Sequence, residues 1–264
     1  MNLKAISHYL GLFCFPISIL AFINILYSSY FDYFLSIDSY LITLILSLIV
    51  GASLLFFSKN YEKRIIFIDQ LILIILVYFL ISLFISIPFY LSNYQVTFIN
   101  SFFEAISGIT GTGFSTFKNI KYFDPTLILW RSSSQWIGGL YFLFFLIIIF
   151  SNKQFNYKMN NLTYSLDVSI NSGTNIKNLF SKIFIIYSIL SITIFLLLNI
   201  SGIRLFNSLN LSMTLVSGGG FIPTDSLNKI IQSNLQKIVL IISFLFSFLN
   251  FFFFLNIFEK KIIK

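Results

Sequence analysis

Two glycine-rich stretches hold the residues whose chemistry is most specific in this sequence. The first reads SGITGTGF (107–114) and the second reads VSGGGF (216–221), and each lies between long apolar runs. Glycine adopts backbone dihedrals that other residues avoid, so such a loop can turn successive carbonyl oxygens towards one axis. A ring of carbonyl oxygens can replace the hydration shell of an alkali cation. The two stretches are therefore candidate cation-binding loops, and ordinary extracellular turns are the alternative interpretation.

A short apolar segment precedes each glycine stretch. The segments 95–108 and 204–217 are helix-like but too short to cross a bilayer. At about 1.5 Å per residue, each can enter the outer half of the membrane, and the chain can then return. The C-terminal end of such a helix carries a partial negative charge, which favours cations over anions. The candidate ligands are the backbone carbonyl groups of Thr110, Gly111, Thr112, Gly113, Val216, Ser217, Gly218 and Gly219.

The composition places these loops in a membrane. The chain has 264 residues, of which 57% are hydrophobic and 10% are charged, and its mean hydropathy is +0.90. A soluble domain needs more charge than this on its surface. Because an apolar run of about 20 residues crosses a bilayer, we expect an all-α integral membrane protein with six transmembrane helices and two re-entrant loops. The predicted spans are 8–28, 39–57, 67–88, 126–150, 183–202 and 235–257.

The distribution of basic residues predicts the orientation in the membrane. Lysine and arginine gather in the connections 58–64 and 151–182 and in the tail 259–264. The positive-inside rule places these segments in the cytoplasm, with both termini inside the cell membrane. The first span lacks a small-residue cleavage site, so we expect a retained helix rather than a signal peptide. The net charge of +8 is scattered between the spans, so the lipid bilayer, and not nucleic acid, is the expected partner.

The order of the elements predicts an internal repeat. Residues 1–64 form an N-terminal transmembrane helix pair, and residues 65–150 form a first pore repeat of span, pore helix, filter loop and span. Residues 151–182 form a cytoplasmic linker, and residues 183–264 form a second pore repeat with a basic tail. The two repeats have the same orientation, which makes them parallel repeats.

One charged pair is expected beside the first loop. Arg131 lies within a predicted span, where an uncompensated charge is costly, so it needs a partner. Glu104 lies on the first predicted pore helix and could supply the opposite charge. In the alternative interpretation, Arg131 reaches the outer membrane surface and Glu104 forms local hydrogen bonds.

The sequence contains no recognisable catalytic constellation. It has no phosphate-binding glycine loop, no paired carboxylates at one site and no usable Ser/His/Asp set. Cys14 and His8 are each the only residue of their type, so neither a disulfide nor a cysteine metal site is expected. We therefore expect a protein that is not an enzyme and needs no cofactor.

Two long motifs resemble one transporter family. FFEAISGITGTGFST (102–116), followed by LWRSSSQWIGGL (129–140), closely resembles the first pore repeat of the Trk/Ktr/HKT superfamily of potassium transporters, especially the bacterial Trk-type membrane subunits. TLVSGGGFIPTD (214–225) resembles the filter of their second repeat, and the helix pair in 8–57 resembles the extra N-terminal pair of Trk-type members. The resemblance implies a potassium-channel-like pore for potassium uptake, with potassium as the transported substrate.

The resemblance also implies particular filter residues. Each filter loop of the family contributes one characteristic glycine, and by motif these are Gly113 and Gly219. In plant relatives, serine in place of the first of these glycines accompanies a preference for sodium, so Gly113 favours potassium. Gly218 departs from the pattern because many members carry a hydroxyl residue there. A sodium-permeable relative remains the alternative.

The number of repeats departs from the family pattern. Family members have four pore repeats, and this sequence contains only the two that correspond to the N-terminal half. A homodimer or a second half-subunit would complete the ring of carbonyls. The other possibility is a non-conducting membrane subunit from a split or truncated gene. Since Trk-type subunits work with a cytoplasmic nucleotide-binding ring, the linker 151–182 could also dock a regulatory subunit.

Overall fold

The computed structural model describes residues 2–33, 36–59, 66–150 and 176–248, and all regular structure in these ranges is helical. This agrees with the expected all-α membrane fold. The main helices are α1 (Leu3–Tyr30), α2 (Ile37–Phe57), α3 (Phe67–Tyr90), α4 (Phe98–Ile109), α5 (Pro125–Phe150), α7 (Ile176–Ile200), α8 (Leu205–Val216) and α9 (Asn234–Phe248). Two single turns, η2 (Ile120–Tyr122) and η3 (Leu227–Lys229), lie in the loops after α4 and α8.

Five of these helices are long and apolar enough to cross a membrane, namely α1, α2, α3, α5 and α7. They confirm the first five predicted spans. Helix α7 begins at Ile176, before the predicted fifth span at about 183–202. The polar turn that precedes the apolar run is already helical, and its Leu179 is buried against α5. The sixth predicted span, 235–257, begins as α9, and its remainder lies outside the described residues.

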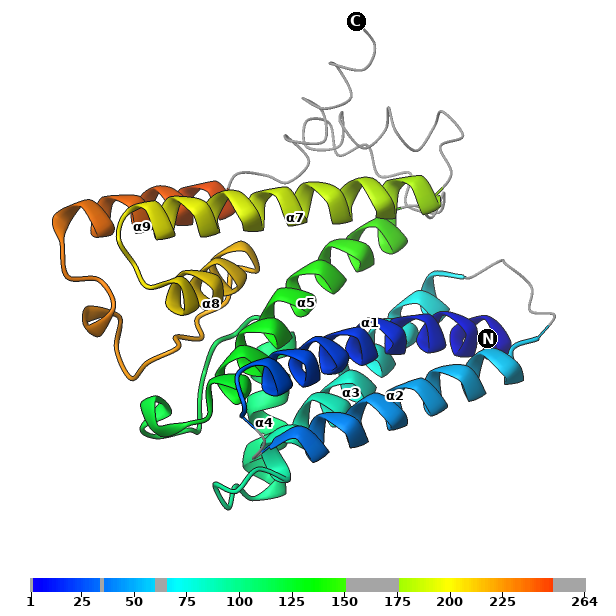
Figure 1. Ribbon diagram of the computed structural model, residues 1–264. Coiled ribbons are helices and arrows are strands. Elements are labelled where there is room, and N and C mark those ends of the chain that lie inside the picture. Colours follow the sequence, from blue (N-terminus) through cyan, green and yellow to red (C-terminus); the bar gives the residue numbers. More distant parts are fainter. Residues whose placement is uncertain (1, 34–35, 60–65, 151–175, 249–264) are drawn as a thin grey trace, which may run out of the picture.

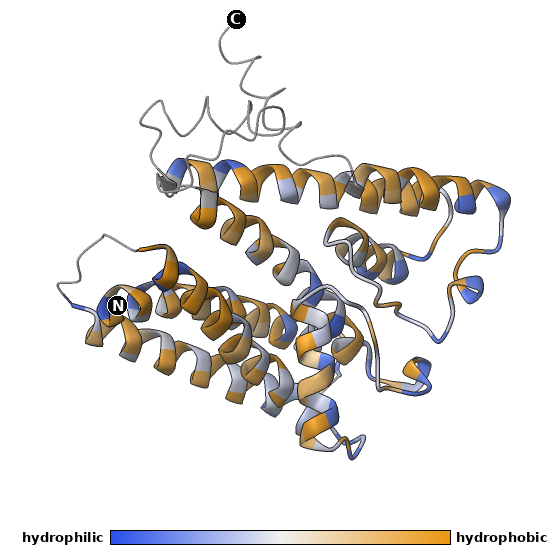
Figure 2. Cartoon of the chain, turned by 180° about the vertical axis from the view of Figure 1, so that it is seen from behind, coloured by the Kyte–Doolittle hydropathy of each residue, from blue (hydrophilic) through white to orange (hydrophobic). Residues whose placement is uncertain are grey.

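The long helices are apolar on most of their surface, whereas their ends and connections are polar (Figure 2). Side chains define several helix starts. The Asn2 side chain accepts a hydrogen bond from the Ala5 N–H at the start of α1, and Thr97 accepts one from the Asn100 N–H at the start of α4. These caps satisfy N–H groups that have no partner within the helix.

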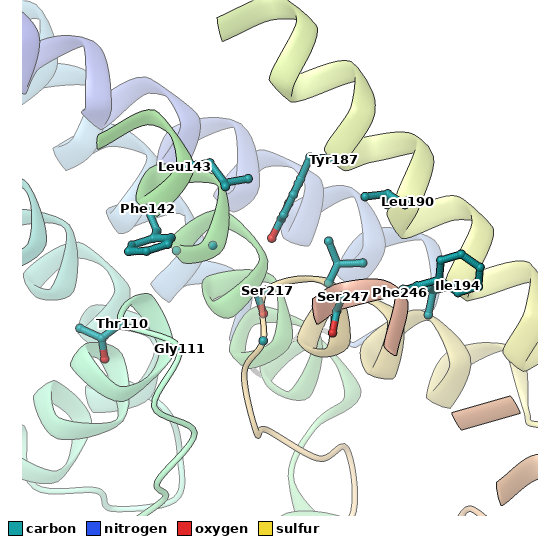
Figure 3. Close-up of a pocket in the computed structure, with 14 residues that line it drawn as sticks. Thr110, Gly111, Phe142, Leu143, Tyr187, Leu190, Ile194, Ser217, Phe246 and Ser247 are labelled. Carbon is teal, nitrogen blue, oxygen red and sulfur yellow. The ribbon is translucent and has the colours of Figure 1, made fainter. Parts of the chain in front are cut away.

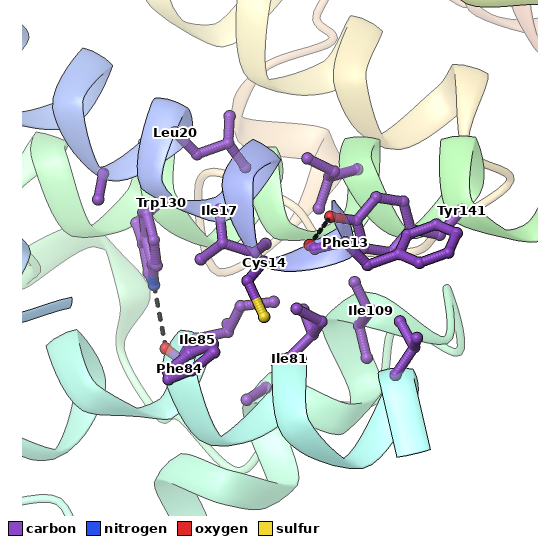
Figure 4. Close-up of a cluster of buried hydrophobic side chains, with 14 of the residues drawn as sticks. Phe13, Cys14, Ile17, Leu20, Ile81, Phe84, Ile85, Ile109, Trp130 and Tyr141 are labelled. Carbon is purple, nitrogen blue, oxygen red and sulfur yellow. Dashed lines mark hydrogen bonds between the residues drawn. The ribbon is translucent and has the colours of Figure 1, made fainter. Parts of the chain in front are cut away.

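Helix α5 runs through the middle of the molecule, with α1–α4 on one side and α7–α9 on the other (Figure 1). A large apolar cluster joins α1 and α3 to α5 (Figure 4). Two α5 side chains also donate hydrogen bonds to backbone carbonyls in this cluster. Trp130 Nε1 donates to the Ile85 oxygen at 3.0 Å, and the Tyr141 hydroxyl donates to the Phe13 oxygen at 2.6 Å. The Tyr141–Phe13 bond attaches the N-terminal helix pair to the first repeat, and the Trp130–Ile85 bond joins α5 to α3 within that repeat.

The chain orders its elements twice in the same way, as α3–α4–loop–α5 and as α7–α8–loop–α9. The end of α2, the starts of α3 and α7 and the end of α5 lie at the same side of the molecule as the N-terminus (Figure 1). The two glycine loops lie towards the opposite side. This arrangement is the one that parallel repeats produce.

Two consecutive glycines allow α5 to pack closely between the short helices. A Cβ at Gly138 would lie 2.8 Å from the Ile109 Cα at the end of α4, and a Cβ at Gly139 would lie 2.8 Å from the Ser217 Cα at the end of α8. Helix α5 is continuous through both glycines. They therefore serve close backbone packing.

Candidate filter loops

The two glycine loops leave their short helices in the same way. Helices α4 and α8 each have 12 residues, and their C-terminal cap residues are Thr110 and Ser217. The next residue in each case is a glycine in the left-handed region, with φ 70° at Gly111 and 69° at Gly218. Glycine commonly ends a helix in this way because a Cβ would be strained there. The local geometry therefore aligns Thr110 with Ser217 and Gly111 with Gly218.

This alignment places Gly220, and not Gly219, at the position of Gly113. The two glycines are also in contact, since a Cβ at Gly113 would lie 2.6 Å from both the N and the Cα of Gly220. Gly113 itself has φ 75°. The two glycine loops, which lie about a hundred residues apart in the sequence, thus meet backbone to backbone at this pair. The pairing of Gly113 with Gly219 expected from the motifs is shifted by one residue.

A cavity of about 330 Å³ lies at the C-terminal ends of both short helices. Five of the predicted filter residues line it, namely Thr110, Gly111, Val216, Ser217 and Gly218. Figure 3 shows Tyr187 of α7 and Phe142 of α5 at its wall, with Ser247 of α9 nearby. The structure therefore brings both helix ends to one cavity, whereas Thr112, Gly113 and Gly219 lie in the loops outside its lining. Among the described residues, no group of His, Cys, Asp or Glu could hold a metal ion.

The predicted pair of Glu104 and Arg131 is confirmed. Arg131 Nε lies 2.5 Å from Glu104 Oε1, and the two side chains are 3% and 0% exposed. Arg131 therefore does not reach the membrane surface. Glu104 also accepts hydrogen bonds from the Ser115 hydroxyl at 2.9 Å and from the Thr116 N–H at 3.0 Å. The ion pair thus holds the segment that follows the first glycine loop.

This chain is similar in sequence to proteins that are named as cation or potassium transporters. It is 27% identical over 172 residues to an uncharacterized cation transporter of Methanocaldococcus jannaschii, a match that covers 60% of this chain and 34% of the relative. It is 24% identical over 200 residues to the Trk system potassium uptake protein TrkG of Escherichia coli, which covers 70% of this chain and 39% of the relative. The crystal structure of the potassium transporter TrkH from Vibrio parahaemolyticus matches with a TM-score of 0.80 at 18% identity, over 95% of this chain and 51% of that one.

The chain is similar in sequence to Trk-type and related cation transporters, and its fold is similar to that of TrkH. No model of a known protein family matches the sequence. The chain spans between a third and two fifths of the two relatives above, and about half of the solved TrkH chain. These relatives are named as transporters and not as enzymes.

The second glycine loop has contacts that the sequence motifs did not reveal. Arg131 Nη1 donates to the Ile222 oxygen at 3.0 Å, and the guanidinium carbon lies 3.8 Å from the centre of the Phe221 ring. Gln135 Oε1 accepts a hydrogen bond from the Phe221 N–H at 3.1 Å. Gln135 lies one helical turn after Arg131 and begins the QWIGGL motif. This position was the only sign in the sequence that Gln135 could contact a glycine loop.

Proposed function

We propose that this chain is a membrane subunit for potassium uptake, and that the backbone carbonyls of its two glycine loops bind the ion. The observation that carries the proposal is the convergence of both loops, through Gly113 and Gly220, beside a cavity at the C-terminal ends of α4 and α8. Those helix ends bear partial negative charge, which favours a cation. The filter in this proposal comprises 110–113 and 216–220.

Two loops supply only half of a closed ring, so the proposed pore includes a second copy of this chain or a second half-subunit. The surroundings of two equivalent phenylalanines support this. Phe221 follows Gly220 and is 1% exposed, because Arg131 and Gln135 of α5 cover it. Phe114 follows Gly113 and is 72% exposed. In a two-fold assembly, α9 of the second copy would stand beside Phe114 as α5 stands beside Phe221.

The proposed location is the cytoplasmic membrane, with both termini inside. The positive-inside distribution of the basic connections supports this orientation. On the inner side, a nucleotide-binding regulatory subunit could dock on the linker 151–182, much of which lies outside the described residues.

Growth of a potassium-uptake-deficient bacterium at low potassium tests the transport function. Expression of the full chain should restore growth, and Gly113→Ala should abolish the rescue at equal membrane abundance. Rescue that fails while the chain is stably inserted would favour the non-conducting subunit. Rescue accompanied by uptake of sodium at the same rate would favour the sodium-permeable alternative.

Disulfide cross-linking tests the homodimer. Counted from the helix starts at Pro125 and Asn234, Phe244 of α9 takes the position of Gln135. In a Cys14→Ala background, Phe114→Cys together with Phe244→Cys should yield a covalent dimer on mild oxidation. Ile75→Cys with Phe244→Cys is the matched control, since Ile75 lies on the exposed face of α3. Absence of the dimer in a chain that rescues growth would favour a different partner subunit.

A further inference from the structure

The second filter loop lacks the side chains that hold the first. In the first loop, the Ser107 hydroxyl donates to the Phe114 oxygen at 2.5 Å, and the Thr112 hydroxyl donates to the Ser107 oxygen at 3.3 Å. In the second loop, Gly219 takes the position equivalent to Thr112, and it has no side chain that could donate. The equivalents of Ser115 and Thr116, which donate to Glu104, are Ile222 and Pro223. An isoleucine side chain cannot donate, and proline has no backbone N–H.

The α5 helix of the first repeat supplies the missing support through Gln135. This side chain is fully buried, at 0% exposed, and its Oε1 accepts the Phe221 N–H at 3.1 Å. Its carboxamide also occupies the space beside Gly219, where a Cβ would lie 2.7 Å from Gln135 Nε2. Gly219 is therefore required at this point because of Gln135, and the two residues form one contact.

Gln135 differs from its neighbour Arg131 in the loop that it serves. Arg131 contacts both loops, since it pairs with Glu104 and also donates to Ile222. Gln135 contacts the second loop at Gly219 and Phe221. Its Nε2 is buried and has no hydrogen-bond partner within the described ranges. A buried donor of this kind is normally satisfied by a water or a carbonyl, and here it lies directly behind the filter backbone.

We propose that Gln135 is a positioning residue for the second filter loop, and that by fixing the backbone at Gly219–Phe221 it sets how well this loop discriminates potassium from sodium. Carbonyl coordination depends on where the oxygens are held, so a loop that relaxes accommodates a second ion size. The part that concerns ion discrimination rests on the proposed transport function, and the part that concerns loop position does not.

Hydrogen exchange on the full chain in lipid nanodiscs tests the positioning role. Gln135→Met keeps the length of the side chain and removes the acceptor. Exchange in peptides that cover 217–223 should become about tenfold faster, because one buried hydrogen bond is lost. Exchange in 107–116 should stay as in the wild type. Ile75→Met, on the exposed face of α3, is the control and should change neither segment.

A second variant keeps the test valid if Gln135→Met merely loosens the protein. Gly219→Ala would displace the carboxamide from the other side of the same contact, and it should accelerate exchange in the same segment. The double variant should add little to either single one, since both break one contact. Equal acceleration in both loops, or none in the second, would overturn the positioning role.

Competition between sodium and rubidium tests ion discrimination. In vesicles that contain Gln135→Met, the sodium concentration that halves rubidium uptake should fall about tenfold, as expected for the loss of about 1.4 kcal/mol of discrimination. A purely structural defect would lower the amount of uptake and leave this concentration unchanged, and that result would overturn the role in discrimination. If the wild-type chain takes up no rubidium, the proposed function fails, while the exchange measurement still decides the positioning role.

Discussion

The two repeats share one backbone plan, but their glycine loops are held by different contacts. The first loop is held by polar side chains of its own repeat, above all by Glu104, which is paired with Arg131. At the equivalent positions the second repeat has Leu211 and Leu240, which belong to a single apolar cluster with α7. In the second loop, the backbone at Phe221 and Ile222 is hydrogen-bonded to side chains of α5, a helix of the first repeat, in addition to the bonds of Gly218 and Gly219 to α8. Each glycine loop therefore has contacts with α5, and the second loop has them across the boundary between the repeats.

The comparison also explains why the described chain is asymmetric at its surface. Helix α5 has a loop on each side, whereas α9 contacts α7 and α8 and leaves Leu245 and Phe244 half exposed. The exposed Phe114 of the first loop is the matching half of the same arrangement. Among the described residues, the first loop therefore has no helix of a preceding repeat beside it, and α9 has no loop of a following repeat beside it.

Removing the ion pair should produce the largest effect. Arg131→Gln leaves Glu104 buried without its partner and frees Ile222, and we expect it to lower the free energy of unfolding by about 3–5 kcal/mol. Thermal unfolding in detergent measures this loss. Glu104→Leu combined with Arg131→Leu gives the first repeat the residues of the second, and it should recover much of the stability.

In this double variant, measuring potassium uptake distinguishes the effect of the ion pair on stability from its effect on transport. Ser115, Thr116 and Ile222 still lack their partners there, so potassium uptake should remain absent although the protein folds. Uptake restored to the wild-type level would show that the pair acts only on stability, and the difference between the repeats would then have no bearing on the filter.

Close packing at Gly138 should produce the next largest effect. Gly138→Ala places a Cβ against the backbone of Ile109, and overpacking of this kind costs about 1–3 kcal/mol. Ser247 takes the same position in α9, and its hydroxyl donates to the Phe244 oxygen of its own helix at 2.7 Å. Ser247→Ala should therefore change the melting temperature little. Similar losses in both variants would mean that α9 packs as closely as α5.

The spans, the short helices and the Glu104–Arg131 pair could be predicted from the sequence. Hydropathy fixes the long helices, and a lone arginine in an apolar span requires a partner. The register between the loops could not be predicted, because each stretch contains several glycines and a shift of one residue leaves the pattern equally good. Only the helix ends at Thr110 and Ser217 decide it. Gln135 was missed because its role depends on which loop α5 contacts, and that is a tertiary property.

Replacing one glycine by alanine in each loop compares how tightly the two loops are packed. Gly113→Ala is strained at φ 75° and also meets the Gly220 backbone, whereas Gly218, at φ 69°, has open space around its missing side chain. Gly218→Ala should therefore cost only the left-handed backbone strain of about 1–2 kcal/mol. Gly113→Ala should in addition separate the loops and abolish potassium uptake. Uptake assays at matched membrane abundance compare the two variants.

The smallest predicted difference concerns the starts of α5 and α9. Only the start of α5 should make the unfolding free energy depend on pH. Asp124 Oδ1 accepts the Thr126 N–H at the start of α5, while the Ser233 hydroxyl accepts the Gln236 N–H at the start of α9. Burial raises the pKa of Asp124, and this outweighs the hydrogen bonds from Thr126, which lower it. The native state therefore binds this proton more readily than the unfolded chain. The stability from Asp124 is fully present below the pKa of the unfolded chain and is lost as pH rises through the raised native pKa.

Asn at this position isolates the effect, because Asp124→Asn keeps the capping oxygen and removes the titration. As the pH rises from about 4 to about 7, the unfolding free energy of the variant should increase relative to that of the wild type. Ser233→Asn should show a constant difference from the wild type over the same range, since serine does not titrate there. A pH-independent difference for Asp124→Asn would mean that the Asp124 carboxylate is as well solvated in the folded protein as in the unfolded chain, and the two helix starts would then be electrostatically alike.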